Sequence, residues 1–96
     1  MNFGAVTLQA GSSVTDNAAG SGGGIYNWYG STTLAASSSV TGNTAQAGGG
    51  IFNDPKTQYP NVVTPAATDI VTLNYLLDET TVSNCAPVDT VPNCLG

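Results

Sequence analysis

Few side chains in this sequence are of the types that carry out acid–base, nucleophilic or metal chemistry. The 96-residue chain has six Asp and Glu residues, a single Lys or Arg, and no His. A polysaccharide hydrolase needs two carboxylates at a fixed separation, and a lyase needs a base such as Arg or Lys. The acidic residues lie far apart in the sequence, except for the adjacent pair Asp78-Glu79. We therefore expect a protein that is not an enzyme and that uses no cofactor or metal.

The glycine-rich segments also lack the sequences that bind phosphate or calcium. A calcium-binding glycine-rich nonapeptide needs Asp after its glycines, whereas the triplets at 22–24 and 48–50 are followed by Ile-Tyr-Asn and Ile-Phe-Asn. The only Lys, Lys56, follows Pro55 at the position where a phosphate loop needs Gly. The formal net charge is −5, so nucleic acid, which requires a basic patch, is not an expected partner.

The two cysteines, Cys85 and Cys94, enclose a loop that contains two prolines. Their spacing is not that of a C-x-x-C redox motif, and two thiols without His cannot supply the four ligands of a zinc site. Short loops of this kind are common in small secreted domains, so we predict a disulfide. A disulfide implies an oxidising compartment, and we expect an extracellular or cell-surface location.

The first residues do not have the basic and apolar segments of a signal peptide, and no apolar run approaches the roughly 20 residues that span a bilayer. We expect no membrane-spanning segment. Either a signal has been removed or the chain is a piece of a longer one.

An internal repeat predicts the fold that must position these residues. Residues 38–53 repeat residues 12–27 at a shift of 26 positions, with eleven of sixteen residues identical. A period between 20 and 50 residues is typical of architectures in which each unit covers the apolar face of its neighbour. Glycine triplets and the many Ser, Thr, Val and Asn residues disfavour helices. We predict an all-β fold, a parallel β-solenoid with three short strands in each rung, spaced about 4.8 Å from the next rung.

The repeat divides the chain into one domain of about three rungs. We expect rung 1 at 3–28, rung 2 at 29–54, a Pro-rich loop insert at 55–69, a partial rung 3 at 70–84 and a capping loop at 85–96. Alternation along the strands predicts core columns and outward columns. The expected core columns are Leu8 with Leu34 and Leu73, Val14 with Val40, and Ile25 with Ile51. The expected outward column is Thr7, Thr33 and Thr72. At the corners we expect two stacked pairs, Asn17 with Asn43 and Asn27 with Asn53.

Two surfaces are candidate binding sites. Aromatic side chains can stack on sugars or fill the pocket of a partner, and they are expected to cluster near the junction of the first two rungs. The candidate interface residues are Tyr26, Trp28, Tyr29, Phe52 and Tyr59. The Thr column is the second surface, because regular Thr arrays on flat solenoids occur in ice-binding proteins. Local cover for the corner loops is the alternative role of the aromatic cluster.

The segment Ser-Val-Thr-Gly-Asn-Thr-Ala, followed by Gly-Gly-Gly-Ile-Phe-Asn at 48–53, resembles the repeats of right-handed parallel β-helix proteins of the polymorphic outer-membrane-protein and bacterial cell-surface type. The ending from Ser83 to Cys94 is similar to the terminal loop of secreted bacterial β-helix proteins. The resemblance implies a right-handed solenoid. It implies little about function, because the family includes adhesins and surface-layer components.

The ends of so short a stack are the remaining feature. An uncovered last rung presents unpaired backbone groups and a cross-section of the core. We therefore expect a structural, self-associating surface protein. Its partner would be another copy, stacked head to tail into a filament, or the rest of a longer solenoid. The alternatives are an adhesin or carbohydrate-binding module that uses the aromatic cluster, and an ice-binding solenoid that uses the Thr column.

Overall fold

A computed structural model describes residues 5–28, 30–54, 62–67, 70–78, 80–86 and 91–94. These residues form β-strands and no helix. The strands are β1 (Ala5–Leu8), β2 (Ser13–Thr15), β3 (Ala18–Ser21), β4 (Ile25–Asn27), β5 (Ser31–Leu34), β6 (Ser39–Thr41), β7 (Thr44–Ala47), β8 (Ile51–Asn53), β9 (Val62–Pro65), β10 (Val71–Thr72), β11 (Tyr75–Leu76) and β12 (Cys85–Ala86).

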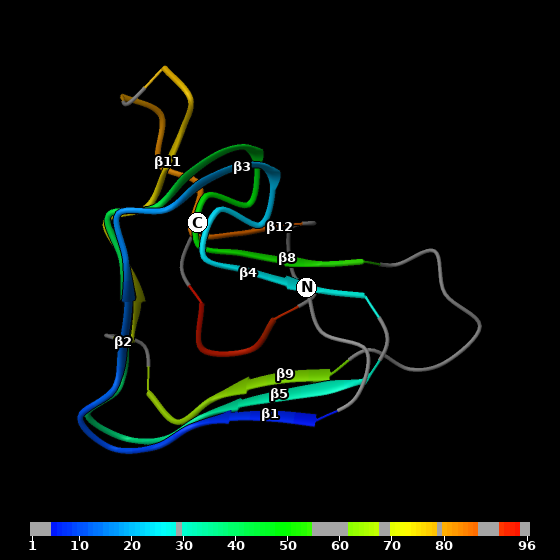
Figure 1. The fold of residues 1–96 in the computed structure, drawn as a ribbon, viewed down its shortest axis with the longest axis vertical. Helices are drawn as coiled ribbons and strands as arrows, with labels where there is room; N and C mark the ends of the chain where they lie inside the picture. The colour runs from blue at the N-terminus through cyan, green and yellow to red at the C-terminus, as the bar shows by residue number, and fades with distance from the viewer. Residues whose placement is uncertain are drawn as a thin grey trace.

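The strands pair in parallel into four three-stranded sheets. Each sheet takes every fourth strand, in the orders β1-β5-β9, β2-β6-β10, β3-β7-β11 and β4-β8-β12. We call β1–β4, β5–β8 and β9–β12 the first, second and third layers. The strands of each sheet lie over one another in Figure 1. The prediction of an all-β chain with stacked parallel strands is confirmed.

The register of the first two layers follows the sequence repeat. Val14 pairs with Val40, and Ile25 pairs with Ile51, each 26 positions further on. Leu8 pairs with Leu34 in the same way. Matching side chains therefore lie above one another and form aliphatic columns. The core contains the fully buried side chains of Leu34, Val40, Ile51 and Val71, together with Val63 and Ile70.

Each layer has four strands rather than the three expected from the sequence. In the first two layers the additional strands are β3 and β7, in the segments Ala18–Ser21 and Thr44–Ala47. Their Ala, Gly, Ser and Gln residues have low β-propensity, so the sequence pattern did not indicate strands there. Pairing with the neighbouring layer holds these segments extended, since Ala18, Ala19 and Ser21 lie opposite Thr44, Ala45 and Ala47.

The third layer differs from its expected alignment. Strand β9 lies within the expected loop insert at 55–69 and pairs with β5, so Thr64 rather than Thr72 continues the column of Thr7 and Thr33. Val71 pairs with Val40, not with a residue of β5. The remainder of the insert, at 55–61 and 68–69, lies outside the described residues.

The same shift of register overturns the predicted position of Leu73. Its side chain is 63% exposed instead of buried in the core with Leu8 and Leu34. Leu73 follows the Val-Thr pair of β10, and the residues in the same place after β2 and β6 are Asp16 and Gly42. All three have a positive φ, between 56° and 70°. This column is therefore a corner where the backbone is left-handed.

The glycine triplets stand where the backbones of adjacent layers meet. A Cβ atom on Gly23 would lie 2.4 Å from the carbonyl oxygen of Thr44, and one on Gly49 would lie 2.3 Å from that of Tyr75. Real Cβ atoms do not approach backbone so closely, so only Gly fits at these positions. The triplets thus bring the chain from the third sheet to the fourth with no room for a side chain.

Candidate functional site

A ladder of asparagine side chains runs through all three layers at the corner before the third sheet. The Nδ2 group of Asn17 donates to Oδ1 of Asn43 at 3.0 Å, and that of Asn43 donates to Oδ1 of Asn74 at 3.0 Å. Each of these Oδ1 atoms also accepts a backbone N–H from the preceding layer. Asn43 and Asn74 are fully buried. The prediction that Asn17 and Asn43 stack at a corner is confirmed.

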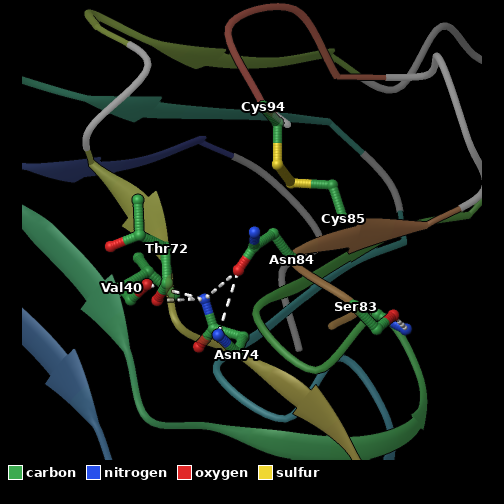
Figure 2. Close-up of a disulfide and its surroundings, with 8 residues drawn as sticks. Val40, Thr72, Asn74, Ser83, Asn84, Cys85 and Cys94 are labelled. Atoms are coloured by element: carbon green, nitrogen blue, oxygen red, sulfur yellow. Dashed lines mark hydrogen bonds between the residues drawn. A yellow bond between two sulfur atoms is a disulfide. The ribbon is translucent and has the colours of Figure 1, made fainter. Parts of the chain in front are cut away.

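The ladder ends inside the third layer. The side-chain oxygen of Asn84 accepts the backbone N–H of Asn74 at 3.0 Å and its Nδ2 group at 3.1 Å, as Figure 2 shows. Cys85 of β12 pairs with Ile51 of β8. Asn84, the residue before Cys85, therefore lies in the third layer at the position that Gly50 has in the second layer. Its side chain therefore takes the position that the asparagine of a fourth layer would have.

The C-terminal segment covers the third layer. Cys85 and Cys94 form the predicted disulfide. Val91 is buried in the same cluster as Ile70 and Val71, and Asn93 donates from Nδ2 to the carbonyl oxygen of Pro65. In Figure 1 this segment, drawn in red, lies between the sheet of β9 and the sheet of β12. The residues described at 91–94 thus close much of this end of the core.

Removing the disulfide should destabilise the protein by about 2–3 kcal/mol, because a bridge over nine positions restricts the unfolded chain and also holds Val91 over the core. The double variant Cys85→Ala/Cys94→Ala should lower the urea midpoint of unfolding and raise its slope slightly, because the unfolded chain without the bridge exposes more surface. The parent protein treated with dithiothreitol is the control and should match the variant. An unchanged midpoint would show that the bridge contributes nothing.

A hairpin covers the outer edge of the third sheet. Tyr75 forms an antiparallel bridge with Val82, and the N–H of Leu76 donates to the carbonyl oxygen of Thr81 at 2.8 Å. In Figure 1 this arm leaves β11 and extends beyond the outline of the sheets. The strand edge that a fourth layer would use on β11 is therefore already paired.

Asp78 fixes the turn of this hairpin. Its carboxylate accepts the backbone N–H groups of Thr80 and Thr81, both at 2.9 Å, and the hydroxyl of Thr81. These bonds, led by the one from the Thr81 backbone, lower the pKa of Asp78 to about 2. A carboxylate that accepts several N–H bonds is stabilised in its charged form.

The hairpin turn should therefore lose its hydrogen bonds only in strong acid. The pKa of an unfolded Asp is about 3.9, so the contribution of Asp78 is complete above that pH and is lost as the pH falls through about 2. The amide resonance of Thr81 should follow this transition in an NMR titration. In the control variant Asp78→Asn, which keeps an acceptor oxygen but cannot ionise, that transition should vanish. A midpoint near 4 in the parent protein would contradict the prediction.

At the opposite end of the stack, the part of the chain that the structure describes provides no such cover. Strands β1–β4 each have a neighbour on one side only. In the second layer, the core side chains of Leu34, Val40 and Ile51 are fully buried. The residues that pair with them in the first layer are partly exposed, and they are Leu8, Val14 and Ile25. Ala19 is exposed where Ala45 is buried, and Val6 is 39% exposed where Thr32 is buried. We call the surface formed by the first layer the uncovered end.

Backbone groups also face the uncovered end. In the second layer, the N–H groups of Ala35, Ser39 and Thr44 donate to carbonyl oxygens of the first layer, at 2.9 to 3.0 Å. The residues that occupy these positions in the first layer are Gln9, Ser13 and Ala18, and their N–H groups point away from the second layer. Within the described residues, the uncovered end thus combines partly exposed apolar side chains with four strands that are paired on one side only.

The aromatic candidates lie along the fourth sheet, on β4 and β8. The rings of Tyr26 and Phe52 stack with centroids 5.2 Å apart, and Trp28 meets Tyr26 edge-on at 6.3 Å. Trp28 is 38% exposed. Ala86 continues the column in the third layer, so the aromatic rings end there. We call Tyr26, Trp28 and Phe52 the aromatic strip.

Asp54 adds a carboxylate to the aromatic strip. The hydroxyl of Tyr26 donates a hydrogen bond to Oδ2 of Asp54, which is largely buried. This hydrogen bond raises the pKa of the Tyr26 phenol, and burial and the negative charge of Asp54 add to the effect. The phenol therefore remains protonated and oriented toward the carboxylate well above neutral pH.

The structure brings together three of the five predicted interface residues, and Tyr29 and Tyr59 lie outside the described residues. Sequence reasoning missed Asp54, although its position directly after Phe52-Asn53 placed it beside Tyr26 in the predicted register. It also missed that Asn84 ends the asparagine ladder.

No family model, curated protein or solved structure matches this chain. Within the described residues, no three His, Cys, Asp or Glu side chains are grouped as a metal site would require. The same residues include no helix with the length and apolar character needed to cross a bilayer.

Proposed function

We propose that this chain is a non-enzymatic structural protein that self-associates end to end, in the extracellular space or at the cell surface. In this proposal the three layers are rungs of a right-handed parallel β-solenoid. The chain visits the four sheets in the same order in every layer, which is the path of such a coil. The right hand is the one that connections between parallel strands almost always adopt.

The observation that carries the proposal is the contrast between the two ends. Among the described residues, the third layer is covered by residues 91–94, Asn84 and the hairpin, whereas the strands of the first layer are paired on one side only and its core side chains are partly exposed. An exposed strand edge above an apolar core is a template for pairing with another chain. The disulfide and the resemblance of the repeats to surface β-helix proteins support the location.

Sedimentation velocity over a wide range of concentration tests self-association. We expect the weight-average mass to rise above that of one chain as the concentration increases. A folded monomer at every concentration would refute the proposal. Circular dichroism of the same samples, with the minimum typical of β-sheet, provides the control that the chain is folded.

The aromatic strip favours a second candidate function, binding of carbohydrate. The ring of Trp28 is 38% exposed beside those of Tyr26 and Phe52, and aromatic faces of this kind can stack on sugars. Trp28 is the only Trp, so its fluorescence reports on this surface alone. Oligosaccharides should shift the emission in the parent protein and in Thr33→Ala, a variant of an exposed residue on another sheet, but not in Phe52→Ala. No shift with any oligosaccharide would reject this function.

A further inference from the structure

We infer that the uncovered end of one copy docks on the uncovered end of a second copy, forming a closed pair with two-fold symmetry. This inference rests on the end-to-end association of the proposed function and identifies which surfaces meet. Identical surfaces related by a two-fold axis make the commonest protein dimers. Three features of the structure lead to this arrangement rather than to a head-to-tail stack.

The first feature is the cover on the third layer. A head-to-tail stack would need the uncovered end of one copy to reach β9–β12 of the next. The edge of β11 is paired with the hairpin through the Leu76–Thr81 bond, and Asn93 bonds to the carbonyl oxygen of Pro65 in β9. Val91 lies over the core of the third layer. A second copy would have to displace all three contacts, so the third layer is a poor partner.

The second feature is the charge of the uncovered end. A surface whose charges are all acidic brings like charges into a two-fold interface, so it can meet its own copy closely only if those charges are few. The described residues of the first layer, 5–28, contain one charged side chain, that of Asp16. The chain as a whole carries a net charge of −5, and the other acidic residues follow the second layer's last strand. The described residues of the uncovered end therefore bring few like charges to a copy of the same surface.

The third feature is the area and the polarity of the strand edges. The molecule extends 32 × 30 × 20 Å, and its layers stack along the shortest axis, so the uncovered end is one of its two broad faces. Turning one coil upside down on another reverses the direction in which its strands run. Strands across the interface would therefore be antiparallel, and the N–H groups of Gln9, Ser13 and Ala18 would find carbonyl oxygens of the partner.

The side-chain amide of Asn17 also faces this interface. Its Nδ2 group donates to Oδ1 of Asn43 and to the carbonyl oxygen of Thr15. These hydrogen bonds of the asparagine ladder do not use Oδ1 of Asn17. In the layers above, the corresponding oxygens each accept two hydrogen bonds. Oδ1 of Asn17 thus has acceptor capacity directed at the uncovered end, where edge N–H groups of a second copy can donate.

Variants of the uncovered end test the arrangement. Ala19 lies on this surface with its side chain exposed, so Ala19→Lys should leave the single chain folded but bring two unpaired charges into the interface. We expect the dissociation constant of the pair, measured by sedimentation, to increase at least about 100-fold. Ala36→Lys is the matched control, because Ala36 is equally exposed but lies in the turn after β5, and it should leave the constant unchanged. The opposite ranking would overturn the inference.

A distance measurement remains decisive if Ala19→Lys fails to fold. The native cysteines are paired, so a cysteine introduced at Ala10 or at Leu77 is the only site for a nitroxide label. In the two-fold pair, labels at position 10, next to the uncovered end, should be much closer together than labels at position 77 on the hairpin. Similar distances at both positions, with growth beyond two copies, would mean a head-to-tail stack and would overturn this inference but not self-association. A monomer at every concentration would overturn both.

Discussion

Replacing Asn74 with Ala should destabilise the protein by about 3–5 kcal/mol, a large part of the stability of a small domain. Asn74 is fully buried, and its side chain donates to the carbonyl oxygens of Val40 and Thr72 and to Asn84. It also accepts the backbone and side-chain N–H groups of Asn43. Alanine leaves these partners without water and without a replacement bond. Urea unfolding, analysed at a constant slope, measures the loss.

Asn17→Ala is the matched control for this prediction. Asn17 has the same place in the ladder but lies at its exposed end, where water can replace the lost hydrogen bonds. We expect a loss of about 0.5–1 kcal/mol. Equal losses for Asn17→Ala and Asn74→Ala would contradict the conclusion that burial makes the ladder a major source of stability.

Gly49→Ala should destabilise the protein by about 3 kcal/mol or more, because the third layer would have to move away to make room for the new methyl group. The new methyl carbon would lie 2.3 Å and 2.7 Å from the carbonyl oxygen and the nitrogen of Tyr75, and 2.9 Å from the carbonyl oxygen of Ser83. All three atoms belong to backbone, so no side-chain rotation relieves the overlap. Thermal unfolding followed by circular dichroism measures the effect.

Gly20→Ala is the control in the other direction. An added Cβ at Gly20 meets no atom within 4 Å, and its φ lies outside the left-handed region. Alanine also restricts the unfolded chain, so the variant should gain about 0.4–1 kcal/mol. A loss of stability in Gly20→Ala similar to that in Gly49→Ala would mean that the close approach of the layers is not what selects glycine.

The first two layers could be predicted from the sequence because the repeat is close to exact in its pairing residues. Val14 and Val40, or Ile25 and Ile51, share both identity and neighbours, so the shift of 26 positions gave their register directly. Strands β3 and β7 could not be predicted in this way. Their small residues do not alternate between apolar and polar, and it is pairing between layers that makes them strands.

The third layer was misaligned because a three-residue match outweighed a longer pattern. The tripeptide Val71-Thr72-Leu73 has the same sequence as residues 6–8. The pattern that sets the register is instead Val-Thr-x-Asn, which occurs at 14–17, 40–43 and 71–74. Physical chemistry favours the second alignment, since it places Asn74 in the buried ladder and leaves Leu73 at an exposed corner. A buried amide without partners would cost more than one exposed Leu.

The candidate surfaces could be predicted only in part. Stacking of Tyr26 on Phe52 follows from the register, and the disulfide follows from the cysteine loop. The difference between the two ends does not follow from any local pattern. It depends on Asn84, Asn93 and the hairpin reaching back across the third layer, which are contacts between segments with no repeat to align them.

The regular pairing of the layers also gives this protein a natural unit of growth. The first and second layers pair with a constant shift of 26 residues, and an inserted copy of the repeat could pair with its neighbours in the same register. This pairing does not involve the segments near the C-terminus that cover the third layer. A duplication of 26 residues inside the repeat would therefore lengthen the molecule by one further tier while leaving both termini of the stack as they are. Evolution or design could adjust the height of such a protein independently of what its two ends do.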